Sequence, residues 1–300
     1  MSKIEDALNK LRGQSQPASS RRDSPRPSRG GSPLAGRSAI PIAGRKKIAV
    51  DGPKHHVSQN DLIQGGLLAP LDKAVPIADE FRKIKRPLIA NAVKPHAEAG
   101  ERMNVVMIAS AMSGAGKTFC AVNLAVSISL ERELNVLLVD ADVAKPHISR
   151  EFGLENEPGL IDLLVDESRD MSDFLVRTDL NDIQVLPAGR HHPEATELLA
   201  SDRMSYIVRE LADRYPDRLI IIDSPPLLIT SEAQAIAGQV GQIALVVEAG
   251  VTSHQMVAQT IEMLDESKAI NLLLNKTRHS SSFGGYYGGR YGFYGHDEVA

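Results

Sequence analysis

The residues best suited to chemistry form a short loop of glycine and other small side chains. The run from Ser110 to Thr118 reads SAMSGAGKT and fits the phosphate-loop pattern GxxxxGK followed by Ser or Thr, except that Ala111 stands at the first glycine. An apolar run enters the loop and a helical pattern leaves it, so backbone N–H groups at a helix N-terminus can converge on phosphate oxygens. Lys117 offers a positive charge to the β- and γ-phosphates, and Thr118 offers a hydroxyl ligand to Mg²⁺. The loop predicts a site for a nucleoside triphosphate.

One distant residue joins the loop in the predicted nucleotide site. Asn275 begins the sequence NKTR, which resembles the guanine-reading pattern NKxD but has Arg278 at the position of the aspartate. That departure favours adenine over guanine, and therefore ATP as the nucleotide. The predicted nucleotide contacts are Ser113, Gly114, Ala115, Gly116, Lys117, Thr118, Phe119 and Asn275.

Three carboxylates follow apolar runs elsewhere in the chain. Asp140 and Asp142 come after VLLV, and Asp223 comes after LIII. Ligands of open α/β sheets bind at the carboxyl ends of the strands, where an aspartate beside a phosphate loop is a usual partner of Mg²⁺. A helix cap is the alternative for any single aspartate, but three together favour metal–nucleotide chemistry. We predict Mg²⁺ ligands at Thr118, Asp142 and Asp223, and a charge-neutralising role in phosphoryl transfer for Lys117.

These residues must be positioned by an alternation of apolar runs and helical patterns. Apolar runs bounded by turn signals predict strands at 104–109, 135–139, 183–186, 219–222, 243–247 and 270–274. Helical patterns between them predict helices at 117–130, 159–166, 201–213, 231–238 and 253–266. Strands that are apolar on both faces indicate a parallel sheet covered on both sides. We predict an α/β fold in three layers, the P-loop NTPase fold, with a mostly parallel central sheet between helices.

Composition divides the 300 residues into unequal segments. Residues 1–11 predict a short amphipathic helix, either a frayed terminus or a docking helix. Residues 12–47 predict a disordered basic linker rich in Ser, Arg, Pro and Gly, with nine basic residues and one acid. The linker carries a net charge of +8 and residues 1–11 are neutral. Residues 48–300 therefore carry −12, since the whole chain carries −4. Residues 48–276 are the predicted nucleotide-binding domain, with its core from about 76, and residues 277–300 are a flexible tyrosine-rich tail.

The composition also excludes several classes of protein. A single cysteine, Cys120, rules out an intrachain disulfide framework and fits a reducing compartment. No apolar run approaches the roughly 18–20 residues that cross a bilayer, and the N-terminus lacks the apolar core of a signal peptide. Basic runs such as 12–47 are mostly solvated, so no specific nucleic acid is expected. A cytoplasmic location is predicted.

Half of the twelve aromatic residues lie in the last 18 positions. The tyrosines of this tail, Tyr286, Tyr287, Tyr291 and Tyr294, are interspersed with glycine, so a flexible chain can bring each of them into an active site. An adhesive aromatic tail without chemistry is the alternative.

Three motifs together resemble those of the bacterial tyrosine kinase family. Its phosphate loop begins with Ser and has the form of Ser110–Thr118; a DxD motif matches Asp140 and Asp142; and a DxPP motif matches Asp223–Pro226. PAG at 187–189 and ELL at 197–199 add to a resemblance that covers residues 76–300. The N-terminal sequence MSKIEDALNKL is similar to that of cytoplasmic autokinases of exopolysaccharide loci.

The resemblance implies an ATP-dependent protein-tyrosine kinase that phosphorylates its own C-terminal tyrosines in trans and regulates exopolysaccharide or capsule synthesis and export. It implies ATP and Mg²⁺ as cofactors and catalytic roles for Lys117, Asp140, Asp142 and Asp223, with Asp140 orienting or deprotonating the incoming hydroxyl. The implied partners are further copies of the chain, a membrane-bound polysaccharide chain-length or activator protein that could recruit it to the membrane, and a tyrosine phosphatase.

The chain departs from the family at two places. Ala144 stands where the DxD motif usually continues to an Arg, although Lys145 is adjacent. The family's ExxRxxR oligomerisation helix can be aligned here in two ways. Apolar anchors select Asp79, Arg82 and Lys85, whereas identity selects Glu80, Lys83 and Arg86.

A competing hypothesis is a non-kinase ATPase switch of the partition or division-site type. Those ATPases carry a signature lysine at the position of Met112 and lack a tyrosine-rich tail. Both features of this sequence favour the kinase.

Overall fold

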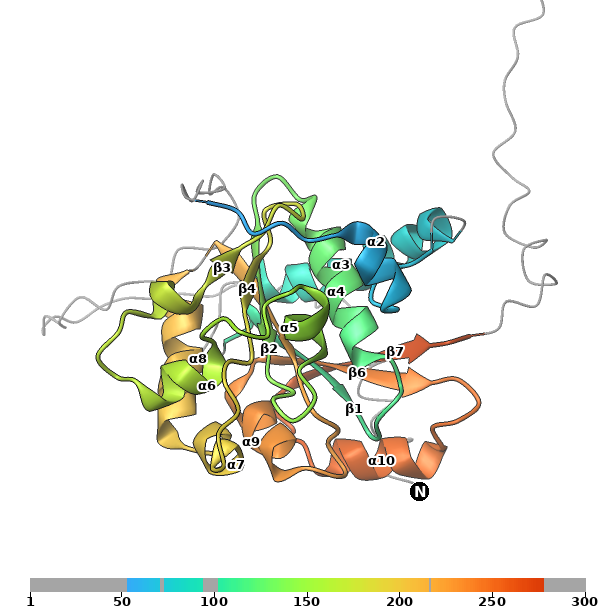
Figure 1. Ribbon diagram of the computed structural model, residues 1–300. Coiled ribbons are helices and arrows are strands. Elements are labelled where there is room, and N and C mark those ends of the chain that lie inside the picture. The colour runs from blue at the N-terminus through green and yellow to red at the C-terminus, as the bar shows by residue number, and fades with distance from the viewer. Residues whose placement is uncertain (1–52, 71–72, 94–101, 216, 278–300) are drawn as a thin grey trace, which may run out of the picture.

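The computed structural model describes residues 53–70, 73–93, 102–215 and 217–277 (Figure 1). The predicted N-terminal helix, the whole of the basic linker and the tail tyrosines lie outside these ranges. Within the described residues, no helix is both long enough and apolar enough to cross a membrane.

A seven-stranded sheet forms the middle layer, in the order β3-β4-β2-β5-β1-β6-β7. All neighbouring strands are parallel except β3, which is antiparallel to β4. The strands are β1 (Val105–Ser110), β2 (Asn135–Asp140), β3 (Val176–Arg177), β4 (Gln184–Leu186), β5 (Arg218–Asp223), β6 (Gln242–Glu248) and β7 (Ala269–Asn275). Every residue of β1 and β5 is buried, as expected for central strands covered on both faces.

Helices cover the sheet on both sides, as Figure 1 shows. They are α2 (Gln59–Gln64), α3 (Ala74–Val93), α4 (Lys117–Ser129), α5 (His147–Glu151), α6 (Leu160–Val165), the 3₁₀ helix η1 (Met171–Phe174), α7 (Ala195–Leu199), α8 (Asp202–Arg214), α9 (Ser231–Gln239) and α10 (His254–Glu262). One apolar cluster joins α3 and α4 to the sheet, and a second joins α6, α8 and α9 to its other face. The three-layer P-loop fold is therefore confirmed.

The segment before α2 extends the sheet edge at β3. The backbone N–H of His55 donates to Arg177 O at 2.8 Å, and Asp179 N–H donates to His55 O at 3.0 Å. The His55 ring is half-buried, with Nε2 2.8 Å from Phe152 O. Asn123 of α4 donates to Leu67 O at 2.8 Å, so the chain from 53 to 70 packs on the same core.

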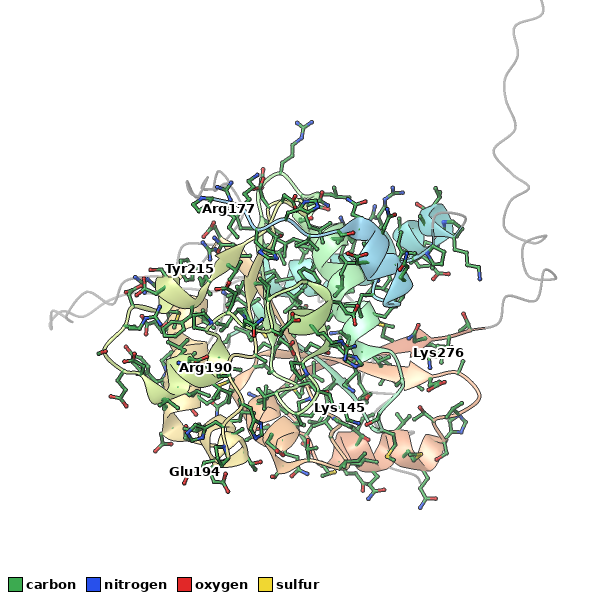
Figure 2. All side chains as sticks on the ribbon, in the orientation of Figure 1. Lys145, Arg177, Arg190, Glu194, Tyr215 and Lys276 are labelled. Atoms are coloured by element: carbon green, nitrogen blue, oxygen red, sulfur yellow. The ribbon has the colours of Figure 1, made fainter. Side chains whose placement is uncertain are left out.

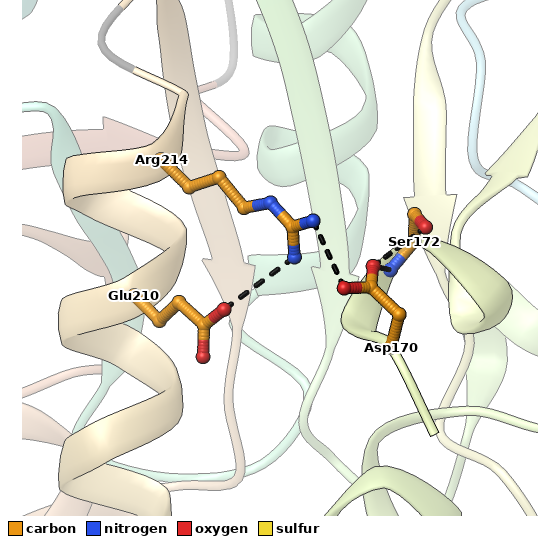
Figure 3. A network of polar contacts seen from close by, with 4 residues as sticks. All are labelled: Asp170, Ser172, Glu210 and Arg214. Carbon is orange, nitrogen blue, oxygen red and sulfur yellow. Dashed lines mark hydrogen bonds and ion pairs between the residues drawn. The ribbon is translucent and has the colours of Figure 1, made fainter.

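A polar network fastens η1 to the end of α8 (Figure 3). Arg214 donates to Asp170 at 2.9 Å and to Glu210 at 3.4 Å. Asp170 also accepts from the backbone and the hydroxyl of Ser172, at 2.9 and 2.6 Å. The Arg214 bond and these serine bonds hold the pKa of Asp170 well below its usual range. The network fixes the long connection that leads from α6 to β3.

Candidate active site

The phosphate loop lies between the end of β1 and the start of α4 and is held by its own backbone geometry. Gly114 and Gly116 have φ values of +88° and +92°, in the region that favours glycine. Ser110 Oγ donates to Met112 O at 2.6 Å, and Leu227 N–H donates to Ser110 O at 2.9 Å. Ser113 and Gly114 are exposed, so this part of the loop is open to a ligand.

The loop is also held from the far edge of the sheet, by residues at the end of β7. Asn275 Nδ2 donates to Ala115 O at 2.8 Å. Lys276, labelled in Figure 2, donates to Gly114 O at 2.7 Å and pairs with Glu248 at 3.0 Å. Asn275, predicted from sequence as a nucleotide contact, is therefore brought to the loop. Sequence reasoning missed Lys276 as a loop contact, although its place beside Asn275 in the NK pair was a signal.

Replacing Gly116 with alanine is expected to destabilise the protein more than the same change at Gly114. Both glycines have positive φ, so each alanine carries a backbone cost of roughly 1–2 kcal/mol. A Cβ on Gly116 would in addition collide with the Asn275 amide, whereas one on Gly114 meets nothing within 4 Å. Chemical unfolding of the nucleotide-free variants measures the difference. Equal destabilisation of the two would contradict the contact between Asn275 and the loop.

Sheet register brings two of the predicted carboxylates, Asp140 and Asp223, beside this loop. In the parallel register, Asp140 at the end of β2 lies opposite Asp223 at the end of β5, and Asp223 lies opposite Ile108 of β1. Lys117 is buried, and burial lowers the pKa of its ammonium although Asp223 and Asp142 oppose the shift. Lys117, the half-buried Asp142 and the buried Asp223 thus interact electrostatically. Asp140 belongs to the same cluster, because its charge raises the pKa of Asp223.

Burial dominates the protonation of two of these carboxylates. It raises the pKa of Asp140 to about 7, against hydrogen bonds from Ser149 that favour the charged form. It raises the pKa of Asp223 to about 8, with the Asp140 charge adding to the shift and a hydrogen bond from Thr118 opposing it. The Oδ1 atom of each carboxylate is buried and has no partner among the described residues.

The oxygen donors fit Mg²⁺ bound together with a nucleotide. No group of three or more His, Cys, Asp or Glu side chains in the described ranges could hold a metal ion unaided. Mg²⁺ usually takes only one or two carboxylates and completes its shell with phosphate oxygens and water. Asp142, Asp223 and the Thr118 hydroxyl match that set. Oδ1 of Asp223 is buried, has no partner among the described residues and can coordinate a cation.

Two further positions singled out in the sequence are Phe119, beside the phosphate loop, and Ala144, beside the DxD motif. The ring of Phe119 packs at 6.1 Å from that of Phe81 on α3, so it joins the loop to that helix. Ala144 is exposed. Burial raises the pKa of Asp142, and the charges of Lys117, His147 and Lys145 oppose that shift. A positive charge therefore reaches the DxD segment even though the arginine is absent.

Comparisons with known proteins agree with this geometry. The sequence model of the AAA domain family matches residues 103–276. The tyrosine-protein kinase YwqD of Bacillus subtilis is 34% identical over 195 residues, which span 64% of this chain and 81% of YwqD. The putative tyrosine-protein kinase CapB of Staphylococcus aureus is 30% identical over 216 residues, which span 71% of this chain and 90% of CapB.

A solved structure gives the same result. The kinase domain of the Escherichia coli tyrosine kinase ETK superposes with a TM-score of 0.56 at 26% sequence identity, over 69% of this chain and 80% of that domain. The phosphate loop, its buried carboxylates and these relatives lead to one assignment. The chain belongs to the bacterial tyrosine-protein kinase family.

Proposed function

We propose that the chain uses Mg·ATP to phosphorylate tyrosine, and that its own tail tyrosines, Tyr286, Tyr287, Tyr291 and Tyr294, are the acceptors. The observation that carries the proposal is the buried cluster of Lys117, Asp140 and Asp223 at the carboxyl end of the sheet, directly beside the phosphate loop. Phosphoryl transfer depends mainly on positioning and charge stabilisation, so such a cluster suffices for it.

Each residue of the cluster has a distinct role in this proposal. Thr118, Asp142 and Asp223 would hold Mg²⁺, which when bound would supply positive charge to the transferring phosphoryl group. Lys117 neutralises the same group from the loop side. Asp140 orients the tyrosine hydroxyl and accepts its proton as the new O–P bond forms and the bond to the leaving phosphate breaks. Burial favours that proton transfer because it raises the pKa of Asp140 to about 7.

The test is to incubate the full chain with Mg·ATP and to map phosphotyrosine by mass spectrometry. Phosphate on the four tail tyrosines is expected, and its loss in a variant with all four changed to phenylalanine would identify the acceptors. Mixing a chain truncated after residue 277 with a full-length Lys117→Met acceptor shows whether transfer occurs in trans. Phosphate release without phosphotyrosine would favour an ATPase switch instead.

We further propose that α3 takes part in self-association. The residues involved are those of the alignment by identity, Glu80, Lys83 and Arg86. Lys85 is buried, with its ammonium 2.5 Å from Ser127 O and 2.6 Å from Glu131, so it is already bound within its own chain. Arg82 pairs with Asp79 one turn away. Lys83 and Arg86 are exposed, which supports the alignment that uses them. Phosphorylation in trans would then occur between neighbours in the assembly.

Changing Arg86 to glutamate is expected to shift the assembly toward smaller species, because it reverses an exposed charge on the proposed contact face of α3. Arg209→Glu is the matched control, since Arg209 is an exposed arginine on α8. Analytical ultracentrifugation of both variants gives the mass distribution. An Arg86→Glu profile identical to that of Arg209→Glu would remove α3 from the contact.

The wider assignment rests on family resemblance. We propose that the kinase is governed by a membrane-bound activator of polysaccharide export and reversed by a tyrosine phosphatase, and that it regulates exopolysaccharide or capsule synthesis.

A further inference from the structure

Asp140 is held by a hydrogen-bond chain through Ser149, a residue that belongs to none of the recognised motifs. The buried Ser149, on α5, donates its hydroxyl to Asp140 Oδ2 at 2.7 Å, and its backbone N–H donates to the same oxygen at 2.8 Å. The hydroxyl oxygen of Ser149 in turn accepts the backbone N–H of Ala188 at 2.9 Å. Residues from three separate segments therefore meet at one serine side chain.

The two oxygens of the Asp140 carboxylate consequently differ in their hydrogen bonding. Oδ2 of Asp140 receives both Ser149 donors, whereas Oδ1 is buried with no partner among the described residues. A carboxylate with one oxygen fixed in this way cannot rotate without losing two buried hydrogen bonds. Its second oxygen, the buried and unpartnered Oδ1, is then held in one direction.

The Ala188 end of this hydrogen-bond chain lies in a loop that is itself held by hydrogen bonds. Gly189 follows with φ +86°, and the buried Asp162 accepts the backbone N–H and the Nε–H of Arg190 at 3.0 and 2.6 Å. Asp162 also accepts Gly159 N–H at 3.0 Å. The serine hydroxyl is thus held against a braced loop, which fixes the direction of its proton toward Asp140.

We infer that Ser149 is a positioning residue for phosphoryl transfer: it holds Asp140 so that Oδ1 faces the tyrosine hydroxyl, and it does so through the braced loop at Ala188. This inference rests on the proposed tyrosine kinase activity and deepens it. Ser149 lies outside the phosphate loop, so its role concerns the acceptor step and not the binding of ATP.

Ser149→Ala removes the hydroxyl and leaves the backbone donor in place. We expect kcat for phosphotyrosine formation on a full-length Lys117→Met acceptor to fall about 10- to 100-fold, the effect of a misplaced reacting group. ATP affinity, measured with a fluorescent ATP analogue, should stay within about twofold, since no nucleotide contact is removed. Ser149→Thr keeps the hydroxyl and should restore most of kcat. Ser127→Ala, which removes another buried serine hydroxyl, serves as the control.

A double-mutant cycle tests whether Ser149 acts through Asp140. In the Asp140→Asn background, Ser149→Ala should cost nothing further. Unchanged kcat in Ser149→Ala, equal losses in the alanine and threonine variants, additive losses with Asp140→Asn, or an equal loss in Ser127→Ala would each overturn the inference. If the wild-type chain itself forms no phosphotyrosine, the proposed function fails, and this role fails with it.

Discussion

Replacing Lys117 with methionine is expected to reduce tyrosine phosphorylation by at least about 100-fold, comparable to the removal of one preorganised transition-state donor. The side chain is 7% exposed and its ammonium interacts with Asp223 and Asp142. Methionine fills much of the buried space of the lysine stem but provides no charge for the transferring phosphoryl group. Quantitative phosphotyrosine analysis under saturating Mg·ATP measures the loss.

The control for this variant is Lys54→Met, which removes an exposed ammonium 2.6 Å from Asp182. It should retain wild-type activity. If Lys117→Met kept more than about a tenth of the wild-type rate while folding normally, the role given to the phosphate loop would be wrong.

Replacing Asp223 with asparagine is expected to abolish activity and yet to stabilise the metal-free protein at alkaline pH. Burial raises the pKa of Asp223 from 3.8 to about 8. Between those values the folded state binds more protons than the unfolded state, so the stability contributed by this group is complete below about pH 4 and is lost as the pH rises through 8. Asparagine resembles the protonated acid and does not ionise.

The stability gain should therefore be small near pH 4 and should grow to several kcal/mol by about pH 8. Thermal unfolding in EDTA, from pH 5 to 8.5, measures it as a difference in Tm between the variant and the wild type. Mg·ATP should narrow the difference, because a cation compensates the buried charge in the wild type only. Asp213→Asn, at an exposed position of α8, should show no comparable change with pH. A parallel pH dependence of wild type and Asp223→Asn would contradict the burial argument.

The sheet and the site around it were predictable because local sequence dictates them. Six apolar runs predicted β1, β2, β4, β5, β6 and β7 to within one or two residues, since each strand is a continuous apolar run, even the edge strand β7. Once the strands are parallel, residues at their carboxyl ends must meet at one edge. That rule alone placed Asp140, Asp142 and Asp223 beside the phosphate loop.

Other parts depend on contacts between distant residues and could not be predicted. The segment 53–70 joins the fold through backbone bonds to residues near 177, more than 100 positions away. The sequence left Lys85 in one of two alignments of the oligomerisation helix. Only its contacts with Ser127 and Glu131, more than 40 positions away, show that its ammonium is bound within its own chain. Ser149 belongs to no motif, and only the packing of α5 against β2 brings it to Asp140.

The attachment of Lys276 to the phosphate loop gives the chain an unusual mechanical property. Lys276 has φ +57° and donates to Gly114 O, and the segment that carries the four proposed acceptor tyrosines follows it in the sequence. The start of the tail is therefore joined to the phosphate loop of its own molecule, so a displacement of Lys276 would break its contact with Gly114 O. Under the proposed transfer in trans, a subunit whose tail is drawn into a neighbour's site would lose this support of its own loop.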